Sequence, residues 1–125
     1  MATASVRYIV DDVEEAIRFY GSLGFEIDFH PAPGFAILSQ GDLRLLLNAV
    51  AGGGGAAQPA ADGRMPEPGG WNRIQIEVDD LEATVEALRG EGASFRTDLA
   101  RGRGGDQILV EDPSGNAVEL FQPAA

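Results

Sequence analysis

The sequence predicts an α+β fold of two tandem βαβββ modules, whose strands form a cupped mixed sheet with the helices on its outer face. The first observation is internal repetition, because the segment VDDVE at residues 10–14 returns as VDDLE at residues 78–82. The second is that the same spacing persists through the residues that follow, so that Gly24 corresponds to Gly92. A self-match at long period indicates duplicated modules.

The first module begins with an alternating run at residues 6–10, typical of a strand. Asp12 followed by Glu15 resembles a capping box, and apolar residues then recur at helical spacing. Gly24 suits the left-handed position that ends a helix, and Pro31 is expected to end the strand that comes next. Three strands are expected at residues 25–29, 35–39 and 43–48.

The second module repeats this order. A strand is expected at residues 73–78, and a helix should begin at Asp80 and stop near Gly90 and Gly92. Three further strands are expected near residues 94–97, 107–111 and 117–121.

The chain of 125 residues is predicted to form a single domain, 1–125. Its modules are placed at residues 1–50 and 71–125. Residues 51–70 contain four consecutive glycines and three prolines, which is typical of a solvated linker. The alternative is a flap over the cup, and the sequence leaves both open.

Composition excludes several classes of function. The chain has no cysteine, which removes disulfides, thiolate metal sites and a cysteine nucleophile. The net charge of −11 argues against nucleic acid, which binds basic surfaces. No apolar run is long enough to cross a membrane, and no secretory leader is recognisable, so a cytoplasmic location is expected.

The paired modules, the two VDD[VL]E helix starts and the closing segment EDPSGNAVEL at residues 111–120 resemble the vicinal oxygen chelate superfamily. This superfamily includes glyoxalase I, extradiol dioxygenases, fosfomycin-resistance enzymes and bleomycin-resistance proteins. The resemblance covers the whole chain outside the 51–70 segment. It implies the fold, but no single motif identifies a reaction.

Enzymes of this superfamily hold a divalent metal in the cup through His and Glu side chains. The resemblance places the corresponding slots of this chain at Ser5, Leu45, Arg73 and Glu119. Only Glu119 matches, because leucine has no lone pair to donate and a guanidinium repels a cation. His30, the sole histidine, falls outside the slots and is interpreted as a surface or loop residue. We therefore expect neither a metal nor another cofactor.

Strand alternation then predicts the lining of the cup if the slot residues face inward. One half of this lining is apolar and the other carries Arg, Gln and Glu, which suits a ligand pocket with a few orienting contacts. A shallow solvated groove is the alternative. The inward residues would be Ser5, Arg7, Ile9, Leu43, Leu45, Leu47, Arg73, Gln75, Glu77, Gln107, Leu109, Ala117, Glu119 and Phe121.

Within this lining, Arg73 and Glu119 are expected to form an ion pair, completed by Gln75 or Ser5, that replaces the metal. Aromatic side chains would hold a flat ligand, and arginines would meet its anionic groups. The expected ligand-binding residues are Ser5, Arg7, Phe35, Leu45, Trp71, Arg73, Gln75, Glu77, Arg103, Glu119 and Phe121.

The function expected from this site is metal-independent binding of a natural-product or antibiotic-like molecule, acting by sequestration as in drug self-resistance. The resemblance to bleomycin-resistance proteins implies this function and a homodimer with two pockets. The alternative is a metal-free or atypical-metal glyoxalase-like lyase or isomerase, in which Glu77 and Glu119 would form a carboxylate pair for acid–base catalysis.

Overall fold

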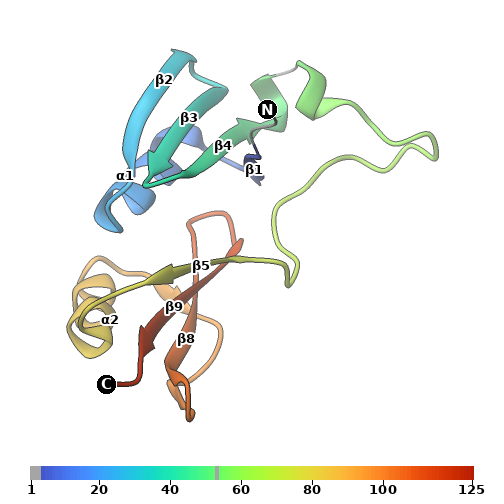
Figure 1. Cartoon of the computed structure of the whole chain (residues 1–125). Coiled ribbons are helices and arrows are strands. Elements are labelled where there is room, and N and C mark those ends of the chain that lie inside the picture. Colours follow the sequence, from blue (N-terminus) through green and yellow to red (C-terminus); the bar gives the residue numbers. More distant parts are fainter. Residues whose placement is uncertain (1–3, 53) are drawn as a thin grey trace. The chain divides into compact units, whose positions relative to one another are not determined.

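The computed structural model describes residues 4–52 and 54–125. The chain divides into two compact units, unit 1 (Met1–Pro68) and unit 2 (Gly69–Ala125) (Figure 1). Each unit contains one long helix and one mixed β-sheet. The predicted α+β class and the two βαβββ modules are therefore confirmed.

Unit 1 has the strand order β1-β4-β3-β2, in which β1 runs parallel to β4 and the other pairs are antiparallel. Two short 3₁₀ turns, η1 (Val50–Gly52) and η2 (Gly55–Ala57), follow the last strand. The main elements are β1 (Val6–Val10), α1 (Val13–Ser22), β2 (Glu26–Ala32), β3 (Phe35–Gln40) and β4 (Leu43–Ala49).

Helix α1 begins and ends where the sequence predicts. The Asp12 carboxylate accepts a hydrogen bond from the Glu15 backbone N–H at 3.2 Å, which satisfies one of the free donors of the first turn. Gly24 has φ +98°, the left-handed conformation expected after a helix. The apolar face of α1 covers one face of the sheet, where Val13, Ala16 and Tyr20 are buried.

Strand β2 continues past Pro31 to Ala32, so the prediction that Pro31 ends it is wrong. β2 is an edge strand, and its pairing with β3 shifts register between Phe29 and Ala32. A proline lacks the donor for a regular ladder, but an edge strand with an irregular register tolerates that loss.

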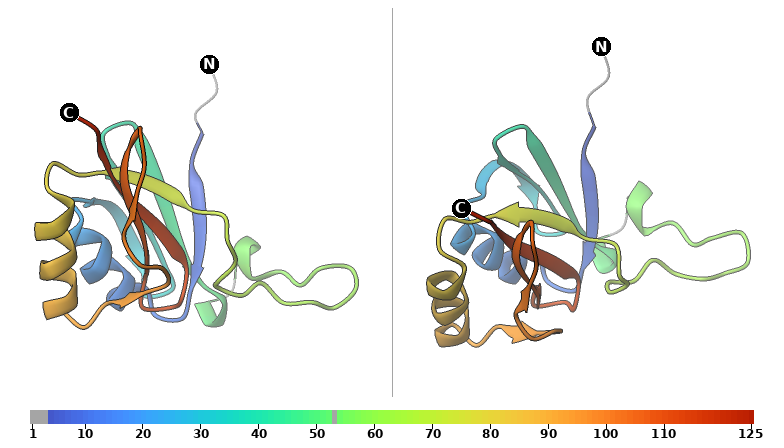
Figure 2. Two further views of the ribbon diagram at one scale, coloured as in Figure 1. Left: turned by 90° about the horizontal axis from the view of Figure 1, so that it is seen from below. Right: turned by 60° about the horizontal axis from the view of Figure 1, so that its bottom comes forward.

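Unit 2 has the order β5-β9-β8-β6, with β7 also paired to β8 and with β5 parallel to β9. Its helix is capped by Asp80, which accepts from the Ala83 N–H at 3.0 Å. Figure 2 shows this helix beside the strands of its own sheet. The elements are β5 (Ile74–Glu77), α2 (Leu81–Gly90), β6 (Ser94–Phe95), β7 (Ala100–Arg101), β8 (Gly105–Glu111) and β9 (Ala117–Pro123).

Residues 58–68 contain neither helix nor strand and form the long loop in Figures 1 and 2. Residues 69–71, which follow this loop in the sequence, belong to unit 2. Among the residues that the structure describes, no helix is both long and apolar enough to cross a bilayer.

Candidate functional site

Leu45 faces the helix in unit 1, not the opposite face of the sheet as predicted. It pairs with Val6 and is fully buried, as is Leu47, which pairs with Tyr8. Residues that pair across a parallel ladder share a face, so Leu45 belongs to the core under α1. The face opposite α1 instead carries Leu46, the partner of Arg7.

Unequal turns explain this error. The β3–β4 hairpin has a two-residue turn between the paired Gln40 and Leu43, whereas the β8–β9 turn spans the five residues 112–116. An alignment of the two modules on the glycines of these turns therefore places each residue of β4 one position away from its true counterpart in β9. Because side chains alternate along a strand, a slip of one residue moves every side chain to the other face.

The face opposite α1 brings together two of the predicted residues of unit 1. Arg7 and Phe35 both line one cavity, together with Asn48, which pairs with Phe35. Ser5 is exposed just before β1 and does not line this cavity.

The central feature of unit 2 is the buried carboxylate of Glu119, which is 7% exposed. Its Oε1 accepts hydrogen bonds from Arg73 Nε at 3.2 Å and from Arg73 Nη2 at 3.1 Å. Its Oε2 accepts from Gln75 Nε2 at 2.6 Å. The predicted ion pair and its completion by Gln75 are confirmed, and both oxygens of the carboxylate are engaged.

Neighbouring positions follow from register. Gln75 pairs with Glu119, and Glu77 pairs with Phe121, so all four lie on the face of the sheet opposite the buried Ile76. Glu77 is exposed and makes none of the hydrogen bonds to Glu119. The structure thus gives Glu119 a guanidinium partner instead of the second carboxylate that acid–base catalysis would use.

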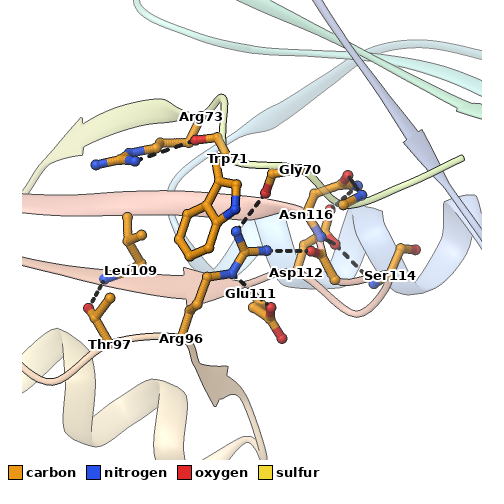
Figure 3. A network of polar contacts seen from close by, with 12 residues as sticks. Gly70, Trp71, Arg73, Arg96, Thr97, Leu109, Glu111, Asp112, Ser114 and Asn116 are labelled. Carbon is orange, nitrogen blue, oxygen red and sulfur yellow. Dashed lines mark hydrogen bonds and ion pairs between the residues drawn. The ribbon is translucent and has the colours of Figure 1, made fainter.

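Trp71 is 66% exposed, but its ring is held in place by Arg96 (Figure 3). The guanidinium carbon lies 4.6 Å from the ring centroid, within the range of a cation–π contact. Arg96 also donates to the carbonyls of Gly70 at 2.6 Å and Gly115 at 2.9 Å, and to Glu111 Oε2 at 3.0 Å. Trp71 is therefore a positioned aromatic surface next to Arg73, which donates to the Trp71 carbonyl at 3.4 Å.

The β8–β9 turn also holds the segment that precedes Trp71 in place. Asn116 accepts a hydrogen bond from the Gly69 N–H at 2.8 Å and donates to Asp112 Oδ2 at 3.0 Å. Asp112 and Asn116 are buried. Residues 69–71 are consequently tied to the same turn by Asn116 and by Arg96.

Arg96 is the functional residue that sequence reasoning missed. Its partners include main-chain carbonyls from two distant segments, and these carry no side-chain signature. An arginine in the short run at residues 94–97 was the only signal available.

Arg103 and His30 make none of the contacts described above. Arg103 is exposed in the β7–β8 loop, and no hydrogen bond or ion pair in the described part of the chain joins it to the Glu119 cluster. His30 lies on β2 instead of a loop, with Nε2 3.3 Å from Glu14 Oε1.

The side chains at the metal slots do not fit a divalent cation. Glu119 has no free oxygen, Arg73 brings positive charge to the same place, and Leu46 at the corrected slot has no donor atom. Within residues 4–52 and 54–125, no group of three or more His, Cys, Asp or Glu side chains is arranged to hold a metal. Zinc, iron and manganese sites need such a donor set.

Comparison with known proteins identifies a family model that matches most of the chain and a relative that matches less than half of it. The model of the Glyoxalase/Bleomycin resistance protein/Dioxygenase superfamily matches residues 3–120. A lactoylglutathione lyase from Haemophilus influenzae is 35% identical over 54 residues, which are 42% of this chain and only 40% of that relative.

Solved structures agree on the fold. A member of the same superfamily from Sphaerobacter thermophilus has a TM-score of 0.72 and 25% identity, covering 98% of this chain and 97% of that chain. A lactoylglutathione lyase from Agrobacterium tumefaciens has a TM-score of 0.70 and 20% identity, covering 97% of this chain and 92% of that chain. The second likeness supports the fold alone.

Proposed function

Because the chain belongs to the Glyoxalase/Bleomycin resistance protein/Dioxygenase superfamily, we propose that it is a metal-independent small-molecule-binding protein that acts by sequestration. Its ligand would be natural-product-like and aromatic. The protein would hold this ligand without transforming it.

One observation carries the proposal, the engagement of both carboxylate oxygens of Glu119 by Arg73 and Gln75. A carboxylate that accepts three hydrogen bonds and carries a guanidinium partner is a poor metal ligand and a poor proton acceptor. Arg73 is 31% exposed, so the outer edge of its guanidinium remains accessible to an anionic ligand group. The positioned ring of Trp71 supplies a flat apolar surface next to that charge.

Metal analysis tests the first half of the proposal. Purified protein should hold well below about one zinc, iron, nickel or manganese per chain, because its slots lack the set of three or more donor side chains that these metals need. Glu119→Gln should leave this content unchanged, as should Asp98→Asn, which removes an exposed carboxylate elsewhere. A metal bound at about one per chain and lost only in Glu119→Gln would contradict metal independence.

Turnover separates binding from catalysis. The protein is incubated with bleomycin and a panel of aromatic natural products. The compounds are then recovered, and their molecular masses are measured by mass spectrometry. We expect a retained compound to come back unchanged. The names of two relatives suggest an assay for the enzyme alternative, in which S-lactoylglutathione is followed over time. More than one product molecule per chain in any reaction would refute sequestration.

A homodimer belongs to the same proposal. Leu45 and Leu47 are buried under α1, so they do not supply an apolar surface for a partner. The face opposite α1 carries a different apolar row, Phe29, Ile37 and Leu46, in which Phe29 is 54% exposed. We propose that a second copy covers part of this row. Sedimentation should then give the mass of two chains, and a monomer at tens of micromolar would argue against it.

A further inference from the structure

The guanidinium of Arg73 keeps two donors for a ligand. An arginine side chain carries five N–H groups. Three of them are used, since Nε and Nη2 donate to Glu119 Oε1 and Nη1 donates to the Trp71 carbonyl at 3.4 Å. The two that remain sit on different nitrogens and have no acceptor among the residues that the structure describes. The side chain is 31% exposed, and a pair of donors on one guanidinium suits the two oxygens of a carboxylate.

Trp71 offers one free face of its ring. The other face carries the Arg96 guanidinium, whose carbon lies 4.6 Å from the ring centroid, while the residue is 66% exposed. Arg96 stays on the ring because it also binds Gly70, Gly115 and Glu111 (Figure 3). A cation on one face draws electron density from the ring, which weakens the attraction of the free face for a second cation. An electron-rich flat ring is therefore the better partner.

The carboxylates around this place are already committed. Glu119 is 7% exposed, and its two oxygens accept from Arg73 and Gln75. Glu111 Oε2 accepts from Arg96 Nε at 3.0 Å. A cationic ligand would have to compete with a guanidinium for either carboxylate. The local groups thus favour an anion, although the whole chain carries a net charge of −11.

The free donors and the ring lie next to one another in unit 2. Arg73 Nη1 bonds to the main chain of Trp71 itself, which holds the guanidinium beside the residue that carries the indole ring (Figure 3). The backbone before Trp71 is fixed by the bonds from Gly69 to Asn116 and from Arg96 to the Gly70 carbonyl. A ligand that uses both groups therefore needs its carboxylate close to a flat ring.

We propose that unit 2 binds a planar aromatic carboxylate and discriminates against aromatic cations. The carboxylate accepts from the two remaining N–H groups of Arg73, and the ring stacks on the free face of Trp71. This inference rests on the proposed function, because it names the ligand class of the same site. It also sets the sign of the ligand charge, which the net charge of the chain alone would set the other way.

The test compares three probes on the full chain. The first is 2-naphthoate, which has both the carboxylate and the flat ring. The second, 2-naphthylmethylammonium, keeps the ring and reverses the charge, and the third, cyclohexanecarboxylate, keeps the charge without the flat ring. Trp71 is the only tryptophan, so its indole N–H gives a single signal in two-dimensional NMR. We expect 2-naphthoate to shift this signal saturably, the cation to bind about tenfold more weakly or worse, and cyclohexanecarboxylate about fivefold more weakly or worse.

Three variants locate the binding. Arg73→Lys keeps the charge beside Glu119 but loses the planar set of donors, and should weaken 2-naphthoate binding about fivefold or more. Arg89→Lys makes the same change at an exposed arginine of α2 and should alter binding less than about twofold. Trp71→Leu should also weaken binding about fivefold or more, as followed at the Arg73 side-chain N–H. Because Trp71 is mostly exposed, this variant should stay folded even if Arg73→Lys does not.

Absence of a saturable indole shift up to about 10 mM 2-naphthoate would overturn the inference. Equal or tighter binding of 2-naphthylmethylammonium would also overturn it, as would an unchanged affinity in Trp71→Leu. None of these results decides the proposed function, which metal content and product formation test, because the protein could still sequester a neutral or cationic compound. Conversely, bound metal or turnover would contradict the proposed function and leave a saturable, charge-selective NMR shift standing.

Discussion

The buried ion pair of unit 2 allows a quantitative prediction. Arg73→Met removes two of the three hydrogen bonds to Glu119 and leaves a carboxylate that is 7% exposed with only Gln75 as partner. Breaking a fully buried pair costs about 3–5 kcal/mol of the free energy of unfolding. Arg73 is 31% exposed, so water can enter after truncation, and we expect a smaller loss of about 2–3 kcal/mol.

A double-mutant cycle measures the coupling free energy between Arg73 and Glu119. Glu119→Gln keeps the shape but removes the charge, and should cost about 1–2 kcal/mol. Arg73→Met combined with Glu119→Gln should cost less than the sum of the two, by about 1–2 kcal/mol, because no charge is stranded. Urea unfolding followed by the fluorescence of Trp71, the only tryptophan, reports on unit 2. A coupling below about 0.5 kcal/mol would refute the view that Glu119 depends on the guanidinium.

Three further substitutions test other features. Gly105→Ala should destabilise unit 2 by more than about 2 kcal/mol, because Gly105 has φ +151° and a Cβ there would overlap backbone. Gly104→Ala is the control, since nothing lies within 4 Å of its Cβ position, and equal unfolding midpoints would contradict the packing argument. Arg96→Met should free the ring of Trp71, which a fall in its fluorescence anisotropy would report. An unchanged anisotropy would mean that Arg96 does not hold the ring. Leu45→Ala should cost about 2–5 kcal/mol in urea unfolding, and a loss below about 1 kcal/mol would place Leu45 outside the core.

Local signals predicted the elements of each module well. The aspartates at positions 12 and 80 cap their helices through backbone N–H groups three residues later, as the sequence pattern requires. The resemblance to the vicinal oxygen chelate superfamily predicted that Arg73, Gln75 and Glu119 are neighbours, and the pairing of Gln75 with Glu119 agrees with it. Charge and geometry at that cluster could therefore be predicted without the structure.

Features that depend on contacts between distant segments could not be predicted. The face of Leu45 depends on the length of a turn, and the two modules differ there despite their similar sequence. Arg96 binds main-chain oxygens of Gly70 and Gly115, which any residue could provide. The sequence could not predict that Asn48 Oδ1 is buried without a hydrogen-bond partner among the described residues, because an exposed asparagine would bond to water.

The engaged carboxylate of unit 2 also limits how this sequence can evolve. A single substitution of Arg73 strands the Glu119 charge, and a single substitution of Glu119 leaves the guanidinium without its carboxylate. Each one-step route toward a metal ligand at these positions thus passes through a less stable protein. Two simultaneous changes, or a prior stabilising mutation elsewhere, would be needed to cross that barrier. The cluster therefore opposes the gain of a metal ligand at these two positions by single substitutions.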